Sequence, residues 1–162
     1  MVYFHEEQRF EWYLTAMFCV PAVIVGYGLF RQYVTQRPLL SGALLWPAFA
    51  VAVVVAVWFL GLKLVTEVRD DGLYVCFVWL WPERLIPWDQ IRSVEIRTYR
   101  PIRDFGGYGV RWAARGIVYH ARGNRGARMV LASGERVLIG SQLPEELTRA
   151  IGARTGLPVG VS

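Results

Sequence analysis

Two long stretches without a charged side chain constrain this fold more than any other feature. They run from Trp12 to Phe30 and from Pro38 to Leu62. A helix over the first stretch rises about 28 Å, close to the bilayer hydrocarbon thickness of about 30 Å. The linker from Arg31 to Arg37 is short and polar, as the turn of a helical hairpin should be. The sequence therefore predicts two membrane-spanning helices. A pair of buried core helices is the alternative.

Composition agrees with a membrane hairpin. Hydrophobic residues make up 54% of the 162 positions and charged residues only 19%, whereas soluble domains carry about 25% charged residues. Neither stretch has an ionisable residue in its interior, which disfavours a transporter or channel and favours an anchor. Basic residues on the loop side are Arg31 and Arg37, against Arg9, Lys63 and Arg69 on the other side. This bias predicts a multi-pass protein of a bacterial inner membrane, with both termini and the soluble domain in the cytoplasm.

From Lys63 onward the apolar pattern changes from helical to strand-like. The predicted strands cover residues 64–69, 73–81, 91–99, 110–113, 116–122, 127–132 and 136–139. A final helix starts at Pro144, buries a stripe that includes Leu147 and Ile151, and stops at Gly156. We therefore expect an N-terminal tail and helical hairpin over residues 1–62. An α+β domain over residues 63–162 should follow, a seven-stranded β-sandwich or barrel with a C-terminal helix.

One predicted strand, Leu73–Trp81, is apolar on both of its faces. A strand with one face in water would alternate apolar and polar residues. The second face is therefore a candidate docking surface for the membrane or a neighbouring chain, and it comprises Tyr74, Cys76, Val78 and Leu80. The alternative is a central strand covered by a helix on one side.

Arginine is concentrated in the middle of the predicted β domain, and the net charge of the chain is +5. Arginines held near a bilayer attract anionic headgroups. The candidate contacts for an anionic lipid or partner are Arg97, Arg100, Arg103, Arg111, Arg115, Arg122, Arg125 and Arg128. The alternative is a solvated face with intramolecular ion pairs. Nucleic acid is a poor candidate partner because no reader motif is present.

No combination of nucleophile, base and orienting group with suitable spacing is visible, so we expect no catalytic residues, no cofactor and no metal site. The segment Gly106-Gly107-Tyr108-Gly109 lacks the Lys-Ser/Thr ending of a phosphate loop and does not precede a helix. It indicates a bulge or a close backbone approach. His120 is a single histidine in a predicted strand, and we expect it to make a structural hydrogen bond.

The order of two N-terminal spans, a short seven-stranded domain and a C-terminal helix resembles the bacterial PH-like membrane proteins. The stretch Ile86-Pro87-Trp88-Asp89-Gln90-Ile91-Arg92-Ser93-Val94 is similar to their strand-entry motif. The runs Phe105–Arg111 and Gly134–Ser141 are similar to segments of an uncharacterised branch, as is Pro144-Glu145-Glu146-Leu147. The similarity covers residues 63–152. It implies a PH-like fold, a membrane location and a capacity for ring-like self-assembly, but no catalytic residues.

The same resemblance shows one departure. Phosphoinositide-binding PH domains carry a basic loop between their first two strands, whereas here that loop is Arg69-Asp70-Asp71-Gly72. Inositol phosphate binding is therefore not expected. The sequence favours a non-catalytic membrane scaffold or interaction protein that docks a partner, an anionic lipid or a second copy of itself. The alternative is an accessory subunit of a membrane enzyme or export complex, engaged through the spans.

Overall fold

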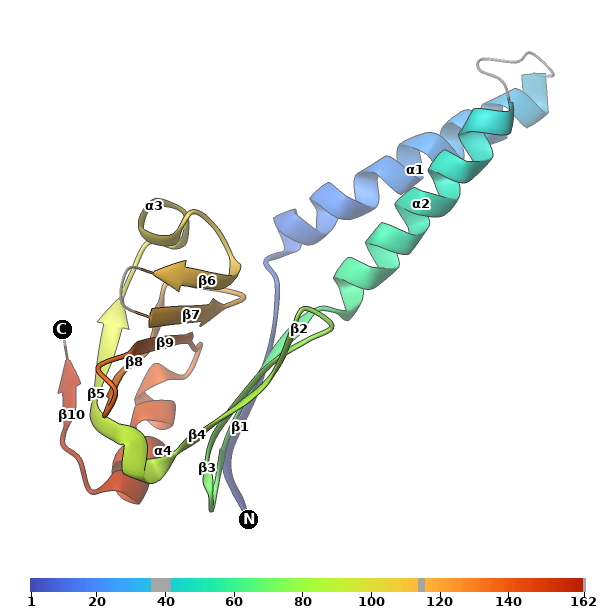
Figure 1. Cartoon of the computed structure of the whole chain (residues 1–162). Coiled ribbons are helices and arrows are strands. Elements are labelled where there is room, and N and C mark those ends of the chain that lie inside the picture. The colour runs from blue at the N-terminus through green and yellow to red at the C-terminus, as the bar shows by residue number, and fades with distance from the viewer. Residues whose placement is uncertain (36–41, 114–115, 162) are drawn as a thin grey trace. The chain divides into compact units, whose positions relative to one another are not determined.

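The computed structural model describes residues 1–35, 42–113 and 116–161 (Figure 1). They form two compact units. Glu11–Leu62 is a pair of helices, and Met1–Phe10 joins Lys63–Ser162 in a mostly β unit. The first ten residues were expected to be a tail of the helical part. The structure instead makes Val2–Arg9 a strand, β1, of the β unit.

The helical unit consists of α1 (Trp12–Thr35) and α2 (Gly42–Gly61). Both helices are long and apolar enough to cross a membrane. They pack through the stacked rings of Phe18 and Phe59, whose centroids are 4.2 Å apart. Gly26 allows a second close approach, because a Cβ there would lie 3.1 Å from the Phe49 ring. The predicted linker was wrong over residues 31–35, which continue α1, and residues 36–37 lie outside the described ranges.

The β unit contains two sheets. Sheet A is antiparallel throughout, in the order β1-β2-β3-β4, with β2 at Lys63–Arg69, β3 at Gly72–Val78 and β4 at Trp81–Pro87. Strand β1 turns the alternate residues Phe4, Glu6 and Gln8 inward. Two of those three are polar, which is why alternation of apolar residues did not reveal the strand.

The predicted strand Leu73–Trp81 was wrong at its C-terminal end. Strand β3 stops at Val78, Trp79 and Leu80 form a turn, and Trp81 begins β4. The cause is the backbone at Trp79, whose φ of 65° lies in the left-handed region and reverses the chain. Trp79 and Trp81 are consequently exposed rather than packed in line with Leu73, Val75 and Phe77.

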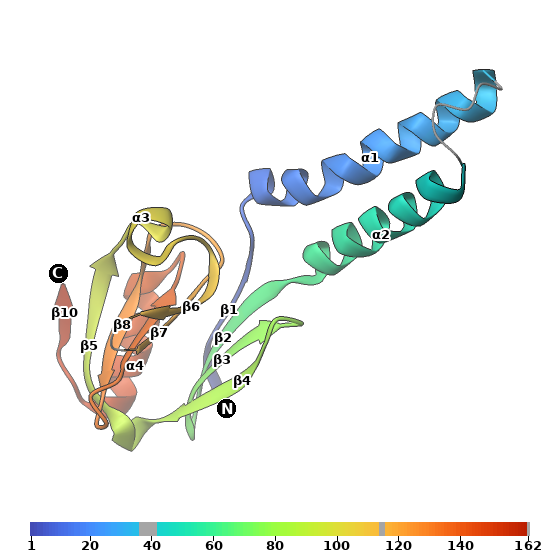
Figure 2. The ribbon, with the colours of Figure 1, turned by 45° about the horizontal axis from the view of Figure 1, so that its top comes forward.

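Sheet B has the order β10-β5-β8-β9-β7-β6. Its strands are β5 (Ile91–Thr98), β6 (Gly109–Ala113), β7 (Gly116–His120), β8 (Arg125–Leu131), β9 (Arg136–Gly140) and β10 (Val159–Val161). A 3-10 turn, η1 (Trp88–Gln90), leads into β5, and a short helix, α3 (Pro101–Phe105), follows it (Figure 2). The described residues thus form ten strands in two sheets rather than the expected seven, and the sheets do not close into a barrel.

The C-terminal helix was predicted correctly. Helix α4 (Pro144–Thr155) has proline at its first position and ends at Gly156 in the left-handed conformation. Its inward residues Leu147 and Ile151 are fully buried, and the helix contacts strands of both sheets, chiefly β5 and β8. It therefore completes the core between sheet A and sheet B.

Polar contacts join the two sheets as well. The buried carboxylate of Glu6 accepts hydrogen bonds from the Ser141 hydroxyl at 2.6 Å and the Gln142 backbone N–H at 2.7 Å. Gln8 Nε2 donates to the carbonyl of Gly140 at 2.7 Å. Because the chain after β9 depends on these acceptors and donors from β1, the N-terminal strand is an integral part of the fold.

We predict that Glu6→Ala destabilises the β unit by about 2–4 kcal/mol, because it leaves the buried hydroxyl of Ser141 and the partly buried backbone N–H of Gln142 without an acceptor. Glu7→Ala is the matched control, since Glu7 lies on the opposite, exposed face of β1 and pairs only with surface groups such as Lys63. Urea unfolding of the detergent-solubilised chain, followed by near-ultraviolet circular dichroism, measures both. Equal stability of the two variants would contradict the structural role of Glu6.

Candidate functional site

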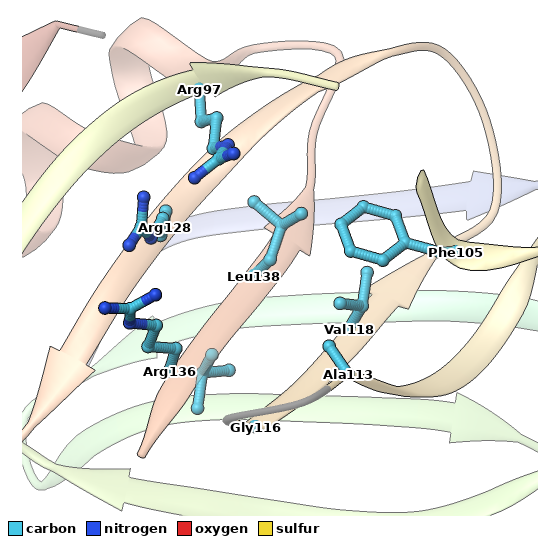
Figure 3. A pocket seen from close by; sticks show the side chains of 9 residues that line it. Arg97, Phe105, Ala113, Gly116, Val118, Arg128, Arg136 and Leu138 are labelled. Atoms are coloured by element: carbon cyan, nitrogen blue, oxygen red, sulfur yellow. The ribbon is translucent and has the colours of Figure 1, made fainter. Parts of the chain in front are cut away.

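Three arginines converge on the outer face of sheet B and line a pocket of about 290 Å³. They come from three adjacent strands, Arg97 from β5, Arg128 from β8 and Arg136 from β9 (Figure 3). Strand register explains the grouping: Arg97 faces Gly126 and Arg136 faces Val130. Each therefore lies diagonal to Arg128 on the same face of the sheet.

The opposite wall of the pocket is apolar. Leu138 of β9 and Val118 of β7 are neighbours in register and form its floor. Phe105 at the end of α3 and Ala113 at the end of β6 pack against them. Figure 3 shows the guanidinium groups on one side of the pocket and these apolar side chains on the other. The pocket is therefore amphipathic.

The arginine side carries excess positive charge. Glu95 pairs with Arg128 at 2.9 Å and offsets one cation. Within the described ranges, neither Arg97 nor Arg136 has a carboxylate partner within 4.0 Å. Two guanidinium groups thus remain available to an anion, with five N–H donors each in a fixed fork.

A buried aromatic group supports the apolar wall. The rings of Tyr99 and Phe105 lie 5.7 Å apart, and His120 lies 5.6 Å from Tyr99. Gly140 makes this packing possible, because a Cβ there would lie 2.6 Å from the Tyr99 hydroxyl. Burial raises the pKa of Tyr99, so the phenol stays neutral. This packing fixes α3, and with it Phe105, over sheet B.

His120 makes the expected structural hydrogen bond. Its Nε2 donates to the carbonyl of Gly107 at 2.7 Å. The glycine segment ends α3 and has positive φ at Gly106, Gly107 and Gly109, and the β6–β7 register that follows shows no bulge. Burial lowers the pKa of His120 to about 4, assisted by the nearby charge of Arg111. The imidazole is therefore neutral at physiological pH.

The candidate arginines of the sequence analysis do not form one surface. Arg97 and Arg128 meet in the pocket, whereas Arg125 pairs with Glu145 at 2.6 Å. The remaining arginines are dispersed. Arg100 and Arg103 line a separate hollow beside Asp104, and Arg111 lies near Gly107. Arg122 is exposed and makes another interaction, and Arg115 is outside the described residues. Sequence reasoning missed Arg136, which only the pairing of β8 with β9 brings to this face.

The candidate apolar surface lies elsewhere, on sheet A. Tyr74, Cys76 and Val78 are half-buried on the outer face of β3, and Leu80 is exposed in the following turn rather than in the strand. The Cys76 thiol has a raised pKa, chiefly because of burial. A raised pKa disfavours the thiolate, so the cysteine has the character of a small apolar side chain.

The pocket lining holds guanidinium, aliphatic and aromatic groups, which can bind but supply neither a general base nor a nucleophile at neutral pH. Among the described residues, no three His, Cys, Asp or Glu side chains gather in a way that could hold a metal ion. The arrangement suits an anionic group attached to an apolar one.

The chain is thus of the class in which an apolar helix pair is joined to a two-sheet β unit with a C-terminal helix. Residues 12–156 match DUF6141, described as a family of unknown function, and the protein belongs to that family. No curated protein and no solved structure matches the chain.

We predict that acid destabilises the β unit through His120. The unfolded histidine takes up a proton near pH 6.5, whereas the folded one stays neutral down to about pH 4. Above pH 6.5 the histidine is neutral in both states, and it does not change the free energy of unfolding. Between pH 6.5 and about pH 4 only the unfolded state binds the proton, so the free energy of unfolding falls by up to about 3 kcal/mol. Urea unfolding between pH 7.5 and 4.5 measures it. His120→Gln should flatten the dependence, and His5→Gln, on the exposed face of β1, is the matched control.

Proposed function

We propose that this protein is a non-catalytic binding protein anchored in a bacterial inner membrane, with a PH-like domain that docks an anionic amphiphile. The single observation that carries the proposal is the pocket with Arg97, Arg128 and Arg136 on one side and Phe105, Val118 and Leu138 on the other.

The membrane assignment rests on the two helices. Both are apolar and long enough to cross a bilayer, and few of their residues are buried within the protein. Large apolar side chains such as Val23, Ile24 and Val54 are more than half exposed. Helices of a water-soluble core would hide such residues, so lipid is the environment that suits them. The arginine bias near the helix ends supports a cytoplasmic β unit.

The PH-like assignment is supported by the order of the elements. Three antiparallel strands, β2 to β4, are followed by a second antiparallel set made of β5, β8 and β9 and then by α4. Three features go beyond that plan: β1 from the N-terminus, the β6–β7 hairpin, and β10. They enlarge both sheets at their edges, and the β6–β7 hairpin supplies Ala113 and Val118 to the apolar wall of the pocket.

The ligand chemistry follows from the two walls. Guanidinium groups bind phosphate or carboxylate oxygens through paired, charge-assisted hydrogen bonds. The apolar wall gains free energy by covering the first part of an acyl chain or a similar group. The volume is at the lower end of the range of about 300–1,000 Å³ for small-molecule pockets, which limits the bound part to a headgroup and a short apolar segment.

We predict that the full chain in an uncharged detergent binds dodecyl phosphate, and that Arg97→Ala or Arg136→Ala weakens binding about ten-fold through the loss of charged hydrogen bonds. Native mass spectrometry of the ligand-bound chain measures this. Arg149→Ala removes the same charge from α4 and should bind normally. Two comparison probes separate the walls: inorganic phosphate lacks the apolar part, and dodecyl maltoside lacks the charge.

Binding that is equal in all three variants would contradict the pocket assignment. Binding of inorganic phosphate as tightly as dodecyl phosphate would mean that the apolar wall plays no part and that the ligand is a free anion.

We also predict that the full chain stays in the membrane pellet after alkaline carbonate extraction, because both helices cross the bilayer. Its mass after solubilisation distinguishes the two partner models. A homogeneous particle of this chain alone supports the scaffold or interaction role. Co-purification of an unlike membrane subunit supports an accessory role through the spans. Release into the supernatant would overturn the anchor.

A further inference from the structure

The turn between β3 and β4 presents an exposed aromatic edge on the β unit. Trp79 is 68% exposed, and Leu80 and Trp81 beside it are also exposed. The Trp81 ring meets Trp112 of β6 edge to face, with centroids 6.3 Å apart, and Trp112 is 75% exposed. We name these four exposed residues, Trp79, Leu80, Trp81 and Trp112, the tryptophan edge.

The tryptophan edge includes a strained backbone conformation at Trp79, which argues for a specific role of the exposed ring. Leu80 N–H donates to the carbonyl of Phe77 at 3.0 Å, which places Trp79 third in a four-residue turn. Trp79 has a φ of 65° there, and it is the one residue other than glycine with positive φ in the described part of the chain. Glycine or asparagine is favoured at such a position, and a bulky side chain is strained. The turn therefore keeps a large ring that its own geometry disfavours.

Strand register places the edge where the chain enters the apolar helices. Arg9 at the end of β1 pairs with Lys63 at the start of β2. Lys63 in turn pairs with Val78, the residue before the turn. Helix α1 begins at Trp12 and helix α2 ends at Gly61. The tryptophan edge thus lies at the same end of sheet A as both covalent connections to the helices.

We propose that the tryptophan edge sits in the headgroup layer of the bilayer, beside the point at which the two helices leave it. This proposal rests on the proposed membrane anchor. Tryptophan has an apolar body and one polar N–H, and it prefers this interface. Arg9 at the same end of the sheet places positive charge near anionic headgroups, whereas Lys63 is already paired with Glu7 at 2.7 Å.

The test uses the full chain in nanodiscs of phosphatidylcholine and phosphatidylglycerol, with Cys19 and Cys76 replaced by alanine. A spin label at Leu80→Cys retains every tryptophan of the edge. Ser133→Cys labels the β8–β9 turn of the same unit and is the aqueous control, and Val54→Cys labels α2 and is the lipid control. Collisions with oxygen and with a water-soluble nickel chelate are compared for each label.

The label at position 133 is expected to collide mainly with the nickel chelate and the label at position 54 mainly with oxygen. The label at position 80 should show an oxygen preference between these two controls, as a position in the headgroup layer does. Adding Trp79→Gly relieves the strained φ and removes the ring. The label at position 80 should then lose its oxygen preference, while resistance to urea is retained or increased. Lost resistance would mean that the ring serves the fold rather than the interface, and would overturn the proposal.

The remaining outcomes separate this inference from the anchor. If position 80 behaves as position 133 while position 54 is in lipid, the edge does not contact the bilayer and the proposed anchor stands. If position 54 is also aqueous, the anchor and the edge proposal both fail.

Discussion

The antiparallel pairing of β1 with β2 is the constraint on which the rest of the structure depends. It sets Arg9 opposite Lys63, so the chain leaves β1 for the helices and returns to β2 at the same end of sheet A. The helices are therefore an insertion into a sheet rather than an appendage at one end. The same pairing turns Glu6 and Gln8 inward, where they satisfy the backbone and hydroxyl groups after β9. Without β1, sheet A would lose its outer strand and the second sheet would lose these partners.

The distribution of charge and apolar surface over the β unit would connect the proposed binding with the proposed membrane attachment. Sheet B gathers arginines from three strands and offsets one of them with Glu95. The opposite wall depends on α3 and on β6, which also carries Trp112 towards Trp81. Strand β6 would thus contact both a lipid headgroup in the proposed pocket, through Ala113, and the proposed interfacial layer, through Trp112. This arrangement gives a physical reason for keeping a hairpin at β6–β7 on the edge of sheet B.

Alternation of apolar and polar residues, together with proline and glycine at the ends of elements, predicted much of the fold. Apolar period two identified most strands, and Pro144 and Gly156 bounded α4. The omissions have specific causes. Strand β1 carries Glu6 and Gln8 on its inner face, and β4 was obscured because Trp79 reverses the chain in a conformation that tryptophan rarely adopts. For the site, the sequence supplied Arg97 and Arg128 as members of a cluster, but it could not separate them from arginines such as Arg125, which pairs with Glu145.

Hydropathy and side-chain period are local properties of the chain, so the sequence alone predicts two long apolar helices and a strand-rich, arginine-bearing unit. Which side chains meet depends instead on how the strands pack in three dimensions. Arg136 joins Arg97 and Arg128 because β9 lies between β8 and β7, and Trp112 joins Trp81 because β6 packs beside the β3–β4 turn. Strand order is set by the total burial of both sheets against α4, and no short stretch of residues encodes it.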